Sequence, residues 1–173
     1  MKLHRHFFEG YFSHCEEYIL SHSHRTFHYK KGEQLFKDIG LAEGSNVYYY
    51  IKSGYTYAYA TTEHGGTKIL CYYASGTFPN IDLAEDTFSA YASEVVEALT
   101  DATMLIFERD TMDEMLKNSF EFTKTLLNFT SEVIALLSYQ AIVLPNLSAE
   151  VRLCDFLYLS YRFAPSVQRH KPE

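Results

Sequence analysis

The stretch from Tyr55 to Tyr73 reads YTYAYATTEHGGTKILCYY, and it has the clearest strand pattern of the sequence. Its first arm alternates tyrosine with threonine or alanine, so an extended strand has one bulky face and one small face. Gly65 and Gly66 supply the positive φ that a tight turn needs, and a second apolar arm follows them. The stretch therefore predicts a β-hairpin whose small-residue face can leave room inside a barrel.

Further apolar runs of strand length lie on both sides of this hairpin. We expect strands at 24–30, 34–37, 46–52, 54–62, 66–73, 87–91, 93–99 and 102–108. Ser13 and Glu16 have the capping-box spacing and predict a short helix over 13–21. The expected fold class is mainly β with α: a double-stranded antiparallel β-barrel of the jelly-roll type, followed by a long C-terminal dimerisation helix.

The periodicity becomes helical after Asp110, a candidate N-cap. Intervals of four and three residues, typical of a coiled-coil seam, connect Phe122, Leu126, Phe129, Val133, Leu136 and Gln140. A second apolar stripe beside this seam contains Leu127, Ile134, Leu137, Ala141 and Leu144. A helix with so much apolar surface must pack on two surfaces, and we expect these to be its own barrel and a partner helix. We therefore expect a homodimer through the 122–140 seam.

Four segments follow from these patterns. They are an N-terminal helical segment at 1–23, a β-barrel at 24–110, the dimerisation helix at 111–145, and a helix and linker at 146–173, with Pro145 ending one helix and Ser148 capping the next. The chain has no N-terminal apolar segment of the secretory type and no run of about 18 uncharged apolar residues, so we expect a cytoplasmic protein without a membrane partner. Its net charge of −7 opposes nucleic-acid binding by these residues.

Several motifs follow one another in a characteristic order. They are a hydrophobic strand ending in glycine at 47–54, the turn Gly65-Gly66, Gly76-x-Phe78, and Val96-x-Ala98-Leu-Thr-Asp101 before the strand at 104–107. Together they resemble the cyclic-nucleotide-binding-domain fold of Crp/Fnr transcription regulators, and the long helix is similar to the dimer helix of that family. The resemblance covers about residues 24–163. It implies an effector-sensing and dimerisation part that contacts DNA only through a domain not present in this chain.

The phosphate-binding motif of that family is altered here. Cyclic-nucleotide binders carry Phe-Gly-Glu and an Arg-Ser/Thr-Ala that pairs with the phosphate. This sequence has Phe78-Pro79-Asn80 and Ala92-Ser93-Glu94 in their place. Loss of the arginine and gain of a carboxylate disfavour a phosphodiester in a dry site. We therefore expect no useful binding of cAMP or cGMP.

Aromatic residues around the altered motif suggest a different ligand. The expected ligand-binding residues are Tyr72, Phe78, Pro79, Asn80, Tyr91, Ala92, Ser93, Glu94, Phe129 and Thr130. An aromatic cleft with a few hydroxyls suits a planar, weakly polar molecule, although these rings could simply fill the barrel. The segment also resembles the halorespiration branch of the family, which senses chlorinated phenols. A small aromatic or apolar effector, with no cofactor, is the resulting expectation.

A cupin-like metal-dependent enzyme on a similar barrel is the alternative. The pairs His4-x-His6 and His22-x-His24 have a spacing that can bind Zn²⁺ from a strand. A cupin also needs a later histidine inside the barrel, but after His28 the sequence has only His64 in a turn and His170 in the tail. Cys15, Cys71 and Cys154 are scattered singly, and no nucleophile motif or phosphate loop is present. We assign no catalytic, haem or metal residue and expect no enzyme.

Overall fold

The computed structural model describes residues 7–35, 47–62, 65–79 and 92–163. The strands are β1 (Phe7–Phe8), β2 (Arg25–Tyr29), β3 (Val47–Ser53), β4 (Tyr55–Thr62), β5 (Thr67–Ala74), β6 (Ala92–Ala98) and β7 (Ala102–Glu108). The α-helices are α1 (Glu16–Leu20), α2 (Arg109–Asn118), α3 (Phe120–Ser138) and α4 (Ala149–Phe163). Shorter helical turns lie at Ser13–Cys15, Tyr139–Val143 and Leu144–Asn146. The chain divides into two compact units, one of which spans Phe7–Ser131.

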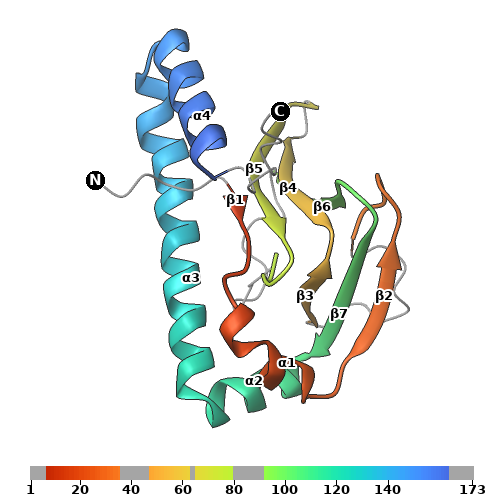
Figure 1. The fold of residues 1–173 in the computed structure, drawn as a ribbon. Helices are drawn as coiled ribbons and strands as arrows, with labels where there is room; N and C mark the ends of the chain where they lie inside the picture. The colour runs from red at the N-terminus through yellow and green to blue at the C-terminus, as the bar shows by residue number, and fades with distance from the viewer. Residues whose placement is uncertain (1–6, 36–46, 63–64, 80–91, 164–173) are drawn as a thin grey trace, which may run out of the picture. The chain divides into compact units, whose positions relative to one another are not determined.

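Two sheets form the β part of the larger unit (Figure 1). One has the strand order β1-β5-β4-β6 and the other has the order β2-β7-β3. All pairings are antiparallel except that of β1, which runs parallel to β5 and aligns Phe8 with Tyr73. The sheets are not closed in the described part of the chain. The predicted jelly-roll fold with a following long helix is confirmed, as an open pair of sheets with one parallel pairing that the sequence did not predict.

Most of the predicted strands are present. The pairing β4 with β5 is the predicted hairpin, and its register shifts between Ala58 and Tyr59. From the predicted strand at 34–37, the described residues contribute a single bridge between Gln34 and Glu97. The predicted strand at 87–91 lies outside the described residues.

The alternation along β4 sets which side of its sheet faces the interior. Thr56 and Ala58 are both 0% exposed, whereas Tyr57 and Tyr59 are partly exposed on the opposite face. The small-residue face is therefore the inner face, as the hairpin sequence predicted. The tyrosines form part of the outer face.

The helical part begins earlier than predicted and is broken at Ser119. Glu108 occupies the N-cap position of α2, and Asp110 lies in the first turn. Ser119 has an extended backbone, and its hydroxyl accepts a hydrogen bond from the Phe122 N–H at 3.2 Å. A side-chain cap of this kind starts a new helix, so α2 and α3 replace one continuous helix after 110.

The second unit contains the end of α3 and the helix α4. Pro145 lies in the short turn between them, and the Ser148 carbonyl accepts the Arg152 N–H at 3.0 Å at the start of α4. The Tyr139 hydroxyl donates a hydrogen bond to the Asp155 carboxylate and connects the π-helical turn to α4. The predicted start of a helix after Ser148 is confirmed, whereas α3 ends at Ser138 and Pro145 lies in a short helical turn beyond it.

The helical stretch from Phe120 to Asn146 is unusually apolar. Its mean hydropathy reaches 1.4, which by length and composition alone is sufficient for a membrane-crossing helix. One such helix is weak evidence, because helices that pack against protein pass the same test. Only 22% of the apolar window is buried within the chain, so much of its apolar surface is uncovered.

Candidate functional site

The inner face of the sheet that contains β4 carries small side chains. Thr56 pairs with Tyr73 of β5 and with Ala98 of β6, and Ala58 pairs with Val96. All of these side chains are buried. The Thr56 hydroxyl has no hydrogen-bond partner among the described residues. A buried hydroxyl without a partner costs free energy, so this position is a candidate contact for a ligand with a polar atom.

A cluster of aromatic rings joins this interior to the first part of α3. The Phe12 ring lies 5.0 Å from Phe78, 5.5 Å from Phe129 and 5.8 Å from Phe122, measured between ring centroids. Phe8 packs edge-on against Phe129 at 5.1 Å. These rings are almost fully buried. The interior between the sheets and the helix α3 therefore share one packed core, which we call the aromatic cluster.

A tight turn at Gly76 holds the N-terminal segment against this cluster. Gly76 has a φ of +78°, and a Cβ at this position would lie 2.8 Å from the Gly10 Cα. The Gly76 carbonyl accepts the Phe12 N–H at 2.8 Å, and the Gly76 N–H donates to the Ile51 carbonyl at 2.9 Å. Only glycine fits this close approach at positive φ. The turn therefore fixes Phe12 beside Phe78.

The structure brings some of the predicted ligand-binding residues together and separates others. Phe78 and Phe129 both belong to the aromatic cluster, where Phe12 lies between them. Pro79 is buried next to this position in the chain, and Thr130 is half-buried on α3. The predicted rings at Phe78 and Phe129 are thus core residues as well as candidate contacts.

Tyr72 faces away from that interior. Its ring stacks on Phe7 at 6.1 Å and lies 6.2 Å from Tyr57, both on the outer face of the sheet. Side chains alternate along a strand, so the neighbouring Tyr73 points inward and approaches Phe129 at 6.4 Å. The inner wall supplied by β5 therefore contains Tyr73 and excludes Tyr72.

The altered phosphate motif is described only in part. Ala92, Ser93 and Glu94 open β6 and pair through the backbone with Thr62, Thr61 and Ala60 of β4. Asn80 and Tyr91 lie outside the described residues, as do the side chains of residues 92–94. Their role in ligand binding stays a prediction.

The seam predicted for the dimer packs within the chain in its first half. Phe122, Leu126 and Phe129 are at most 3% exposed, and the aromatic cluster covers the two phenylalanines. Leu136 and Gln140 are also buried, and Val133 is half-buried. A side chain with almost no exposed surface adds no area to an interface, so this seam does not offer the expected surface to a partner.

The second stripe of the helix is the exposed one. Leu127 is 63% exposed and Ile134 is 59% exposed, and Phe120 and Leu137 are exposed as well. Phe120, Leu127 and Ile134 are separated by seven residues, which is the repeat of a coiled-coil seam. We call Phe120, Leu127, Ile134 and Leu137 the exposed stripe.

The histidines of the described part of the chain contact hydroxyl or carbonyl oxygens. His14 hydrogen-bonds the Thr125 hydroxyl at 2.9 Å, and His28 hydrogen-bonds the Thr103 hydroxyl at 3.1 Å. No group of three histidine, cysteine or acidic side chains that could hold a metal occurs within residues 7–35, 47–62, 65–79 and 92–163. His4, His6, His64 and His170 lie outside those ranges. Nothing in the described geometry favours the cupin-like alternative.

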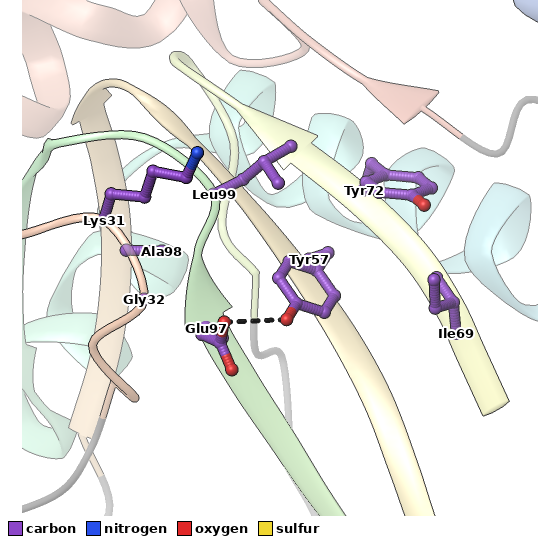
Figure 2. Close-up of a pocket in the computed structure, with 8 residues that line it drawn as sticks. All are labelled: Lys31, Gly32, Tyr57, Ile69, Tyr72, Glu97, Ala98 and Leu99. Carbon is purple, nitrogen blue, oxygen red and sulfur yellow. Dashed lines mark hydrogen bonds between the residues drawn. The ribbon is translucent and has the colours of Figure 1, made fainter. Parts of the chain in front are cut away.

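Sequence reasoning missed two surface grooves. One, of about 250 Å³, lies on the outer face of the sheet and includes Lys31, Tyr57, Tyr72 and Glu97 in its lining (Figure 2). The other, of about 400 Å³, is lined by Tyr11, His14, Glu121, Lys124, Thr125 and Asn128. The tyrosines at every second position of β4 indicated an aromatic face at the first groove. The sequence alone does not show that Glu97 lies opposite Tyr57 on the neighbouring strand. The second groove had no sequence signal.

Comparison with known proteins gives matches among solved structures only. No protein-family model matches the sequence, and no curated protein matches it. CLP, a c-di-GMP responsive global regulator from Xanthomonas campestris, superposes with a TM-score of 0.70 at 16% identity, over 91% of this chain and 76% of that chain. CprK complexed with OCPA gives 0.68 at 14% identity, over 91% and 68%. FixK2 from Bradyrhizobium japonicum gives 0.63 at 18% identity, over 83% and 69%. Identities this low establish a shared fold.

Proposed function

We propose that this chain, which has the fold of the sensor part of Crp/Fnr regulators, is the effector-sensing and dimerisation part of such a regulator. The main support for the proposal is the aromatic cluster, because it packs the interior between the sheets directly against α3. The proposed module is cytoplasmic and is not an enzyme. It reaches DNA through a separate domain, because its own net charge is −7.

The proposed effector is small, aromatic or otherwise apolar, and is not cAMP. It binds on the inner face near Thr56, where the neighbouring Ala58 and Ala98 side chains are small and the hydroxyl can hydrogen-bond one polar atom of the ligand. The absence of an arginine at Ala92 and the carboxylate of Glu94 disfavour a phosphodiester. A similar structure, CprK, is complexed with o-chlorophenolacetic acid, which is in keeping with an aromatic effector on this fold.

The proposed dimer forms through the exposed stripe of α3. Leu127 and Ile134 are exposed on the isolated chain, and burying such side chains in a helix pair is strongly favourable. The opposite face of the same helix carries Phe122 and Phe129, which belong to the aromatic cluster. A ligand that contacts the cluster differently in two arrangements of α3 therefore shifts the population of those arrangements in the dimer.

Two measurements on the purified chain test this function together. Sedimentation velocity should give a dimer at micromolar concentration, and Leu127→Glu should convert it to a monomer. Glu121→Lys changes an exposed polar position on a different face of the same helix and should leave the dimer intact. A thermal-shift screen of neutral phenols and cAMP should give stabilisation by at least one phenol and none by cAMP. A monomeric wild-type chain, or stabilisation by cAMP alone, contradicts the proposal.

A further inference from the structure

The outer face of the β1-β5-β4-β6 sheet has a row of half-buried aromatic rings that lie outside the core. Tyr57 stacks on Tyr59 at a centroid distance of 5.4 Å and an interplanar angle of 24°. Tyr72 lies 6.2 Å from Tyr57 across the β4–β5 pair and stacks on Phe7. Phe7 also contacts Tyr55 at 5.9 Å. All of these rings are partly exposed, so their faces remain accessible from solvent.

A carboxylate is held in a fixed position among these rings. The Tyr57 hydroxyl donates to Glu97 Oε1 at 2.7 Å, and the Tyr59 hydroxyl donates to Oε2 at 3.5 Å. The Gln34 amide in turn donates to the Tyr59 hydroxyl at 3.4 Å. Because Glu97 pairs directly with Tyr57 in the β4–β6 register, the backbone sets this arrangement. The two phenols orient the carboxylate without neutralising its charge.

Tyr57, Tyr72 and Glu97 line a groove of about 250 Å³ on the outer face. Figure 2 shows the Tyr57 ring in the middle of the groove, with Glu97 of β6 on one side and Tyr72 of β5 on the other. Ile69 and Leu99 add apolar surface. The volume is below the usual range for drug-sized ligands and suits a compact molecule.

We propose that this groove binds a small organic cation, an amine or quaternary ammonium group held over the Tyr57 and Tyr72 rings and against the Glu97 carboxylate. The faces of aromatic rings carry partial negative charge and attract cations, and tyrosine is a good partner for them. The carboxylate adds a full charge, with its orientation set by Tyr57 and Tyr59. The site lies on the opposite face of the sheet from Thr56, so it is separate from the proposed effector site.

Lys31 is the one cationic side chain of the groove lining, and it gives the proposal a distinctive test. Its side chain is exposed and ends beside Leu99 in Figure 2. A like charge at the rim weakens the binding of a cation, so removal of this lysine raises the affinity. The affinity for an anionic ligand would instead fall when Lys31 is removed, because the anion would lose its only cationic partner in the lining.

The experiment compares choline with its neutral carbon isostere, 3,3-dimethylbutan-1-ol, on the full 173-residue chain by NMR titration. The two molecules have nearly the same shape, so the difference between them measures the charge. Saturable binding of choline should be about tenfold or more tighter than binding of the isostere. Glu97→Gln should weaken choline about tenfold, and Lys31→Ala should strengthen it. Tyr72→Leu should weaken choline and leave the isostere nearly unchanged.

Glu17→Gln is the matched control, because it removes one exposed carboxylate from α1 and changes the net charge equally. It should leave choline binding unchanged. Circular dichroism of each variant establishes that the fold is retained, and the Lys31→Ala result stands independently of the Glu97 variant. Equal affinities for choline and the isostere, absence of saturation by choline at about 10 mM, or weaker binding in Lys31→Ala would overturn the proposal.

Discussion

Replacing Thr56 by valine should stabilise the ligand-free protein. The Thr56 side chain is 0% exposed, and its hydroxyl has no partner among the described residues. Valine has nearly the same shape and the same preference for strands, so β4 should keep its packing. A buried hydroxyl without a hydrogen bond costs about 1–3 kcal/mol. We therefore expect the free energy of unfolding to rise by about 1 kcal/mol or more, because valine removes that cost.

Thr77 provides a matched control with the opposite sign. It is also 0% exposed, but its hydroxyl donates a hydrogen bond of 2.6 Å to the Ala74 carbonyl. Thr77→Val removes this bond in the same kind of buried environment, so it should lower the free energy of unfolding by about 1–2 kcal/mol. The comparison isolates the hydrogen bond, because both substitutions exchange the same atoms.

Urea unfolding at low protein concentration measures both effects. Circular dichroism and tyrosine fluorescence are suitable probes, since the chain has 15 tyrosines and no tryptophan. The midpoint for Thr56→Val should lie above that of the wild type, and the midpoint for Thr77→Val should lie below it. If Thr56→Val is as destabilising as Thr77→Val, the Thr56 hydroxyl has a partner in the free protein. In that case the Thr56 hydroxyl is not the ligand contact that we propose.

Three further results should follow. Leu127→Glu should abolish the dimer in sedimentation and leave the circular dichroism spectrum unchanged, and a dimer that survives it would move the interface elsewhere. Gly76→Ala should lower the free energy of unfolding by about 2–4 kcal/mol, because the alanine Cβ would lie 2.8 Å from the Gly10 Cα and the backbone φ is +78°. A urea midpoint within error of the wild type would contradict this. The hydrogen bond to Glu97 raises the pKa of Tyr57 from 10.0 to about 12, so the stability from this contact is complete below pH 10 and is lost as the pH rises toward 12. The difference in tyrosinate absorbance between wild type and Tyr57→Phe should show this late titration, and a midpoint near 10 would exclude the contact.

The β part of the fold was accessible from sequence because local patterns specify it. The alternation over Tyr55–Ala60 fixes which side chains share a face, and the glycine turn fixes the hairpin. The pairing of β1 with β5 was not accessible, because two residues, Phe7 and Phe8, carry no periodicity. Their position depends on the turn at Gly76, almost 70 residues away in the chain.

The helix was predicted, but the face that packs inward was not. Both apolar stripes of α3 have spacings of three, four and seven residues, so periodicity cannot distinguish a seam that meets the barrel from one that meets a partner. The choice depends on Phe12, which meets Phe122 and Phe129 from the N-terminal segment. Such a contact between distant parts of the chain has no local signature.

The predicted ligand-binding residues also depend on contacts between distant parts of the chain. Phe78 and Phe129, which the family resemblance placed at one site, both pack on Phe12 in the aromatic cluster, and their contact with a ligand stays a prediction. Tyr72 was assigned to the inner wall, although its neighbour Tyr73 has that position. Two adjacent tyrosines at the end of β5 look alike in sequence, and only the register with β4 shows which one points inward.

The proposed site of the small apolar effector is the inner face beside Thr56. The most direct measurement is NMR of the chain labelled at alanine methyl groups, titrated with neutral phenols and with cAMP. Ala58 and Ala98 report on the inner face, since both are buried there, Ala58 two residues along β4 from Thr56 and Ala98 opposite Thr56 on β6. We expect saturable shifts of these two methyl signals with at least one phenol and none with cAMP. Saturable shifts with cAMP, or phenols that perturb only methyl groups elsewhere, would contradict it.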